Sequence, residues 1–146
     1  MTITLDDVTC LLHILIVGWL IQEDDLDHDH GVELLVTHLL FLVEEAAEHM
    51  SNNLGAFVTY TALKERYEHL LNRCNHFLGE DLLEEEEESR IRPTCVKAFL
   101  LLLFGYTLFA VKNSKTIDLV RMLAIRNLDD IGTWSWGGMG LAYLYE

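Results

Sequence analysis

The stretch YTALKERYEHLLNRCNHFL, residues 60–78, decides the fold class of this chain. Its apolar residues recur at steps of three and four with polar residues between them: Tyr60, Leu63, Tyr67, Leu70, Leu71, Cys74, Phe77 and Leu78. This spacing places them on one stripe of an α-helix. The sequence therefore predicts a long amphipathic helix over 60–78, followed by Gly79, which accepts a left-handed conformation without a Cβ penalty.

A second and more apolar run covers residues 95–111. It is apolar on nearly every side, which is typical of a helix buried in the centre of a domain. Pro93 stands where this helix would begin, because the N–H that proline lacks is not needed in the first turn. Residues 80–92 contain five consecutive glutamates and are predicted to form a solvated acidic loop, with a contact for a basic partner as the alternative.

The N-terminal region opens with a helix signal. Thr4 followed by Asp7 fits a capping pattern, in which the threonine oxygen accepts a hydrogen bond from an early backbone N–H. A first helix is therefore expected to about Leu12. Residues 13–20 fit either an extended segment or a loop, and the acidic residues 23–30 are expected to face solvent.

Four further helices complete the predicted architecture. They are expected near residues 32–40, 43–50 and 116–125, and from Ser135 to the end of the chain. There is no internal repeat and no alternation of strands with helices, so a parallel sheet has no support. The predicted fold is all-α: a single compact helical bundle of about six to seven helices.

Size and composition indicate one intracellular domain. A chain of 146 residues with 51% apolar content can bury a core. Its longest apolar runs fall short of the ~20 residues that span a bilayer, and no secretory signal is recognisable at its start. The three cysteines, Cys10, Cys74 and Cys95, are interpreted as small buried hydrophobic residues in a reducing compartment.

Charge is distributed unevenly along the chain. Residues 1–93 hold 20 acidic and 5 basic residues, a net charge of −15, whereas residues 94–146 hold 4 acidic and 5 basic residues, a net charge of +1. Proteins that bind DNA or RNA directly normally present a basic face to the phosphates. The sequence has no such face, so we expect no direct nucleic-acid binding.

The most metal-like cluster lies between Asp25 and Gly31. It fails as a calcium loop, because the sixth and twelfth positions hold His30 and Val36 in place of glycine and glutamate. His28 and His30 alone would chelate a transition metal weakly. We expect no bound metal; the alternative is a metal-dependent nucleic-acid-processing remnant, or a small enzyme, that uses the cluster from Asp25 to His30.

No catalytic set is recognisable in the sequence. There is no GxSxG motif, and no cysteine has a histidine at a recognised spacing. The glycine cluster at residues 137–140 lacks both the GxGxxG spacing and a P-loop lysine. The sequence therefore predicts no catalytic residue and no cofactor.

Four segments together resemble the plant mobile domain, a transposon-related family also labelled aminotransferase-like. They are ITLDDV (3–8), GAFVTYTALKERYE (55–68), KAFLLLLFGYTLFAVK (97–112) and LDDIGTWSWGGMGLAYLY (128–145). In the last and most specific, a D-x-I-G turn leads into S-W-G, small residues and A-x-L-Y. The resemblance covers nearly the whole chain. Since the family domain usually continues past the SWG helix, we expect a partial domain.

This resemblance implies a nuclear, non-catalytic interaction domain that acts through protein partners. The family occurs in MAINTENANCE OF MERISTEMS-like proteins, in long forms of plant protein phosphatase 7 and in plant transposons. Its members are linked to transposon silencing and genome stability, so a phosphatase 7-like partner is a candidate. A pyridoxal-phosphate enzyme needs a Schiff-base lysine and a phosphate cup on a larger α/β fold. We therefore expect neither pyridoxal phosphate nor stoichiometric zinc to bind.

The last predicted helix is the candidate interaction surface. Its large apolar residues are too many for one helix face to bury: Trp134, Trp136, Leu141, Tyr143, Leu144 and Tyr145. Trp136 is predicted to be buried, and some of the others to remain exposed. Exposed apolar patches commonly mark association sites. We therefore expect self-association, or a protein partner, at this helix.

Overall fold

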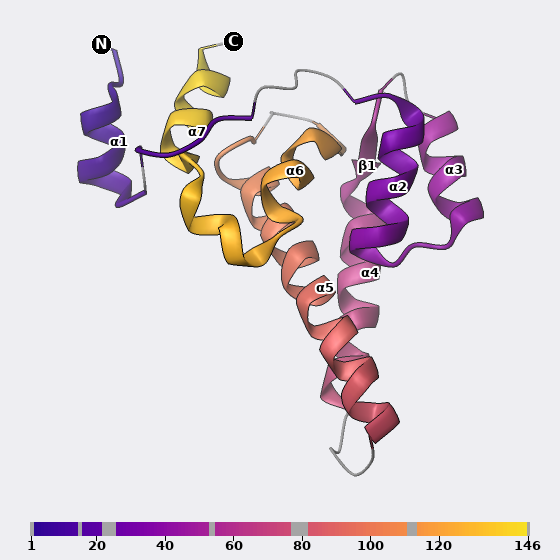
Figure 1. Cartoon of the computed structure of the whole chain (residues 1–146). Coiled ribbons are helices and arrows are strands. Elements are labelled where there is room, and N and C mark those ends of the chain that lie inside the picture. Colours follow the sequence, from indigo (N-terminus) through magenta and orange to yellow (C-terminus); the bar gives the residue numbers. More distant parts are fainter. Residues whose placement is uncertain are drawn as a thin grey trace.

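A computed structural model describes residues 2–14, 16–21, 26–52, 55–76, 82–110 and 114–145. Two long helices, α4 (Tyr60–Asn75) and α5 (Leu82–Tyr106), lie side by side and project from the rest of the domain (Figure 1). The mostly helical fold predicted from the sequence is confirmed. Within the described ranges, no helix combines the length and the apolar character needed to cross a bilayer.

The shorter elements gather around one end of this helix pair. They are α1 (Leu5–Leu12), α2 (His28–Leu39), α3 (Val43–Ser51), β1 (Phe57–Thr59), β2 (Thr116–Asp118), the 3-10 helix η1 (Leu119–Arg121), α6 (Met122–Ile125), the 3-10 helix η2 (Leu128–Thr133) and α7 (Trp136–Leu144). The helices predicted near the N-terminus, near 32–40, near 43–50 and after Ser135 are confirmed. The helix predicted over 60–78 is confirmed as far as residue 76, beyond which its end and Gly79 lie outside the described residues.

The first helix begins with the predicted cap. The Thr4 hydroxyl oxygen accepts from the backbone N–H of Asp7 at 3.3 Å, and the Asp7 carboxylate accepts from the backbone N–H of Thr4 at 2.9 Å. This reciprocal pair satisfies two N–H groups that a helix start leaves unpaired. The hydrogen bonds that the Asp7 carboxylate accepts from the Thr4 backbone N–H and then from the Thr4 hydroxyl hold the pKa of Asp7 below its usual value.

The predicted acidic loop at 80–92 is wrong, because α5 begins at Leu82 and runs through the glutamates. Glutamate is a good helix former, so the run has no local reason to stay irregular. Ion pairs also reduce the repulsion between the like charges. Arg92 pairs with Glu88 one turn earlier in α5, and Arg73 of α4 pairs with Glu87.

Pro93 lies inside α5 and does not start it, contrary to the prediction. A proline in a helix interior removes one backbone hydrogen bond and costs about 3 kcal/mol. The helix continues through this position because residues on both sides of it are packed. Ile91 and Cys95 form a small core with Leu70 and Cys74 of α4. Tertiary packing therefore offsets the local penalty.

The helix predicted over 95–111 differs from the structure in two ways. It ends at Tyr106, after which the backbone N–H groups of Thr107 and Phe109 turn back to the carbonyl of Phe104, at 3.3 and 2.9 Å. It is also not buried on every side, since one face lies in solvent. Uniform apolar content does not reveal which face lacks a neighbour.

A small antiparallel sheet replaces the first half of the helix predicted over 116–125. β1 pairs with β2, and Val58 stands opposite Ile117. Both side chains are buried, and β-branched residues suit this pleated, half-covered position. The Asp118 carboxylate then accepts from the backbone N–H of Val120 at 3.0 Å and starts η1. Only Met122–Ile125 is α-helical there.

The main core lies where α2, α3, the sheet and α6 meet the C-terminal half of α5. Its fully buried members include Leu35, Leu39, Leu101 and Met122. Of the three cysteines predicted to be buried, Cys74 and Cys95 are buried, whereas Cys10 is exposed on α1.

The N-terminal segment packs against α7, at the opposite end of the chain (Figure 1). Trp19 forms a parallel β-bridge with Trp134, which favours the extended alternative for this part of 13–20. The Tyr145 hydroxyl accepts from the backbone N–H of Ile3 at 2.8 Å. The two ends of the chain therefore lie together.

His38 of α2 provides a test of this packing by pH. Burial, followed by the nearby charges of Lys97 and Arg126, lowers the pKa of His38 below its usual value, and Glu33 opposes this effect. The Nζ atom of Lys97 lies 3.3 Å from Nδ1 of His38. Since the unfolded chain takes up this proton more readily, His38 destabilises the fold progressively as pH falls below about 6.5.

Replacing His38 with glutamine is therefore expected to reduce the loss of stability between pH 7.5 and 5.5, measured by urea unfolding. His69 is exposed on α4, and His69→Gln is the matched control. Equal pH dependence in the parent and in His38→Gln would contradict the prediction.

Candidate functional site

Trp136, the first residue of α7, is buried as predicted. Its ring stacks on Phe104 of α5, with the ring centroids 4.4 Å apart. Its indole N–H donates to the backbone carbonyl of Ile131 at 2.9 Å. Trp136 therefore anchors α7 to the core, and a partner cannot reach it without unfolding.

The other predicted interaction residues do not share one surface. Trp134 is half-buried and meets Trp19 edge-to-face at 6.3 Å. Leu141 is half-buried. Tyr143 turns into a cavity, whereas Leu144 and Tyr145 remain 60% and 57% exposed. Tyr143 therefore faces the cavity, whereas Leu144 and Tyr145 face solvent.

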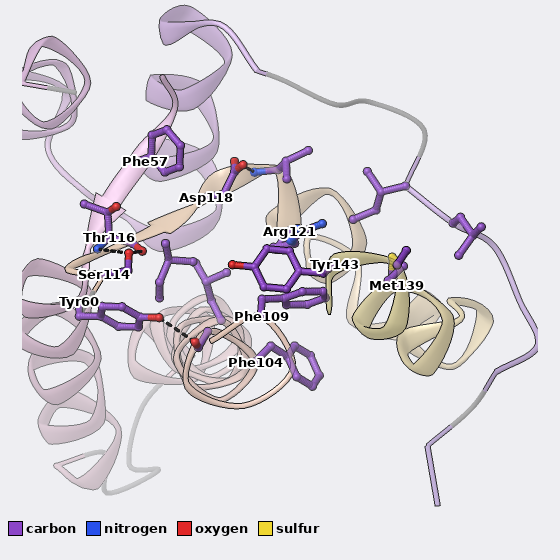
Figure 2. Close-up of a pocket in the computed structure, with 17 residues that line it drawn as sticks. Phe57, Tyr60, Phe104, Phe109, Ser114, Thr116, Asp118, Arg121, Met139 and Tyr143 are labelled. Atoms are coloured by element: carbon purple, nitrogen blue, oxygen red, sulfur yellow. Dashed lines mark hydrogen bonds between the residues drawn. The ribbon is translucent and has the colours of Figure 1, made fainter. Parts of the chain in front are cut away.

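The cavity beside Tyr143 has a volume of about 650 Å³. It is enclosed by the sheet, η1, the C-terminal end of α5 and α7, with the segment at Leu20 and Ile21 at one side (Figure 2). Aromatic rings form much of its wall: Phe57, Tyr60, Phe104, Phe109 and Tyr143. Ser114, Thr116, Asp118 and Arg121 add polar groups to the wall, and cavities of this size are typical of ligand sites.

Among the lining residues that the structure describes, Arg121 of η1 is the cationic one. Its guanidinium carbon lies 4.2 Å from the centroid of the Phe109 ring and 5.4 Å from that of the Tyr143 ring. Both contacts are within the range of cation–π interactions. Arg121 is half-buried and forms no ion pair or hydrogen bond with any other described residue.

Two polar groups of the cavity wall are already used by the fold. The Tyr60 hydroxyl donates to the backbone carbonyl of Gly105 at 2.7 Å, and burial raises the pKa of Tyr60. The Asp118 carboxylate accepts from the N–H of Val120, as described above. Figure 2 places Asp118 on the Phe57 side of the cavity and Arg121 on the Tyr143 side.

A second feature is an apolar stripe along the outer face of α5, formed by Val96, Phe99, Leu103 and Tyr106. These residues recur at steps of three, four and three, which places them on one helix face. Their exposed fractions lie between 42% and 61%. The stripe is therefore a continuous strip of large apolar groups in solvent.

The neighbouring helix widens this apolar stripe at both ends. The Tyr67 ring of α4 packs against Phe99 at 5.9 Å, and the Tyr60 ring stacks on Tyr106 at 4.4 Å. A shallow groove of about 420 Å³ opens beside Val96 and Phe99, and Leu71 of α4 forms part of its wall. The stripe thus borders a groove between two helices.

The metal-like cluster is only partly placed by the structure. Asp25 lies outside the described residues. The Asp27 carboxylate caps α2 by accepting from the backbone N–H of His30 at 2.8 Å. His28 and His30 lie exposed in the first turn of that helix. Helix capping therefore gives Asp27 a structural role.

The Cys95 thiol of α5 is held in its protonated form. Burial, followed by the adjacent Cys74 thiol, raises the pKa of Cys95. A raised pKa keeps the thiol protonated, and the protonated thiol is a weak nucleophile. The α4–α5 cysteines therefore suit packing better than covalent catalysis.

Comparison with known proteins gives the family. The family model described as plant mobile domain matches residues 1–146. The chain belongs to the plant mobile domain family. This confirms the resemblance carried by the four sequence segments.

A curated relative of this plant mobile domain is Protein MAIN-LIKE 2 of Arabidopsis thaliana, with 30% identity over 92 residues. The aligned stretch covers 63% of this chain and 12% of the relative, so the chain spans a small part of that protein's length. No solved structure matches the chain.

Sequence reasoning found one residue of the cavity, Tyr143, and missed the rest. Arg121 carried a usable signal, since it is a cation between apolar residues in the nearly neutral part of the plant mobile domain. Phe57 and Ile117 join the same wall only because the two strands pair. The pairing joins segments about sixty residues apart, and no local pattern specifies it.

Proposed function

We propose that this plant mobile domain is a non-catalytic interaction domain of a transposon-related plant nuclear protein. It acts through protein partners in transposon silencing and genome stability, and a phosphatase 7-like protein is the first partner to test. Membership of the family supports the transposon-related origin. The net negative charge of residues 1–93 favours binding of proteins over direct binding of nucleic acid, because it repels phosphates.

The observation that carries the interaction proposal is the apolar stripe on α5. Monomeric proteins rarely leave a continuous row of large apolar side chains in water, and such rows commonly mark protein-binding surfaces. Aromatic residues such as Phe99 and Tyr106 gain most from burial at an interface. The groove beside the stripe offers space for a helix or an extended segment of a partner.

Replacing Phe99 and Leu103 with serine is expected to lower the recovery of partner proteins from a plant nuclear extract by roughly tenfold or more. Truncating one interface anchor often costs about 2 kcal/mol of binding energy. Recovery is measured by affinity capture followed by quantitative mass spectrometry, with a phosphatase 7-like protein among the candidates scored.

The matched control replaces Leu42 and Val43 with serine. These residues are also large, apolar and exposed, but they lie at the start of α3, away from the stripe. Circular dichroism verifies that both double variants are folded. If the two variants recover the same proteins in equal amounts, the stripe does not bind partners. Light scattering of the parent and the stripe variant reports whether a second copy is the partner.

A further inference from the structure

Two hydrogen-bond donors of the cavity beside α7 have no partner among the described residues. One is the guanidinium of Arg121, and the other is the hydroxyl of Tyr143. Both residues line the cavity, and neither group is fully buried, since no side-chain polar atom in the described residues is both buried and unsatisfied. These two hydrogen-bond donors are therefore available to a ligand in the cavity.

The rings around Arg121 prepare it to bind an anion. A guanidinium that stacks on an aromatic ring keeps its N–H groups at the edge of its plane, where they can meet a carboxylate in a bidentate way. Contact with Phe109 and Tyr143 also removes part of its water. Hydrogen bonds made there are stronger than those made in open solvent.

Charge on the described part of the cavity wall favours an anion with one negative charge. Among the lining residues that the structure describes, Arg121 is cationic, Asp118 is anionic and the others are neutral. A phosphate dianion would bring two charges to the one cation of this described wall. A carboxylate brings one, and Figure 2 shows Arg121 beside the Tyr143 ring, where the two donors can meet the same carboxylate.

The rest of the wall suits an apolar group. Leu101, Phe104, Ile117, Val120 and Met139 line the cavity near the rings already described. A volume of about 650 Å³ accommodates an aromatic or branched aliphatic side chain together with its attached carboxylate. Most of the wall also comes from residues 94–146, the part of the chain that carries almost no net charge.

We propose that this cavity binds an apolar residue bearing a carboxylate, with the carboxylate on Arg121 and Tyr143 and the apolar group against the aromatic wall. The ligand is either a small apolar acid or the C-terminal residue of a peptide, since both present the same chemistry. Tyr60 lines the cavity and also stacks on Tyr106 at the end of the stripe, but Arg121 and Tyr143 lie outside the stripe, so the proposal does not depend on the proposed function.

The test titrates isotope-labelled protein with N-acetyl-L-phenylalanine and with its uncharged amide, followed by NMR. The acid is expected to shift the backbone signals of Phe109, Arg121 and Tyr143, and to bind about tenfold more tightly than the amide, because a charge-assisted hydrogen bond is lost in the amide. Equal affinity for the two probes, or shifts confined to other parts of the domain, would overturn the proposal.

Variants assign the effect to the cavity. Arg121→Gln should abolish the preference for the acid, and Tyr143→Phe should weaken acid binding about threefold. Arg126→Gln is the matched control, since it removes the same charge from an exposed position five residues later and outside the cavity. An acid preference that survives Arg121→Gln, or that Arg126→Gln removes equally, would refute the assignment.

The two ligand sources are separated with a third probe, the peptide acetyl-Ala-Ala-Phe with a free carboxylate. Tighter binding of this peptide than of N-acetyl-L-phenylalanine indicates a peptide terminus, whereas weaker or equal binding indicates a small acid. Either outcome supports the site. Loss of partner capture by the stripe variant has no bearing on these titrations, so the two proposals fail separately.

Discussion

Replacing Trp136 with alanine is expected to lower the free energy of unfolding by about 3–5 kcal/mol. The indole is 6% exposed, it stacks on Phe104, and its N–H donates to the carbonyl of Ile131. Alanine would leave a cavity between α5 and α7 and would remove the indole hydrogen bond to the Ile131 carbonyl. Equilibrium unfolding in urea, followed by circular dichroism, measures the change.

Trp19→Ala is the matched control for this measurement. Trp19 is 72% exposed and contacts Trp134 at a ring edge, so its loss removes little buried area. We expect a destabilisation of about 1 kcal/mol or less for this variant, as for most exposed substitutions. If both tryptophan variants are as stable as the parent, then Trp136 does not anchor α7.

Local patterns predicted the helices whose signals are complete within a few residues. The cap at Thr4 and Asp7 placed the start of α1, and the spacing of Leu63 and Leu70 placed the buried face of α4. These signals depend on hydrogen bonds and packing inside one element. Tertiary context cannot easily override them.

Features that depend on a distant partner were predicted poorly. The glutamates before Arg90 are helical partly because Arg73 of α4 lies beside Glu87, a contact between different helices. Pro93 stays inside α5 because Ile91 and Cys95 pack on α4. At Pro93 a contact between helices offsets the local preference of the sequence, whereas at the glutamates it adds to a local preference for helix.

The candidate sites show the same division. Trp136 was predictable because it sits among Ile131, Leu141 and Tyr145 in the segment that most resembles the family. The apolar stripe was hidden, because α5 is apolar around most of its circumference and the sequence does not show which side lacks a neighbour. Arg121 gained its significance from Phe109 and Tyr143, which reach it from two other segments of the chain.

The contact between the N-terminal segment and α7 depends on Gly18. This residue has φ +140°, a region that residues with a side chain rarely adopt. Its neighbours make three hydrogen bonds across the contact: the Trp19 N–H to the Thr133 carbonyl at 2.8 Å, the Ser135 N–H to the Trp19 carbonyl at 2.9 Å, and the Ser135 hydroxyl to the Ile16 carbonyl at 2.7 Å. A Cβ at Gly18 would lie 2.4 Å from the carbonyl oxygen of Thr133, which is backbone and cannot rotate away.

Gly18→Ala is therefore expected to destabilise this contact by about 3 kcal/mol or more, combining about 1–3 kcal/mol of backbone strain with the weakening of three hydrogen bonds. The N-terminal segment should separate from α7 while the core around α5 stays folded, so amide hydrogen exchange should accelerate at Trp19 and Ser135 and remain slow at Leu101.

Gly132→Ala is the matched control, because a Cβ there meets no atom within 4 Å and its φ is not in the left-handed region. That variant should be neutral or slightly stabilising, since alanine restricts the unfolded chain. Unchanged exchange at Trp19 in Gly18→Ala would mean that the contact between the segment and α7 does not depend on this close approach.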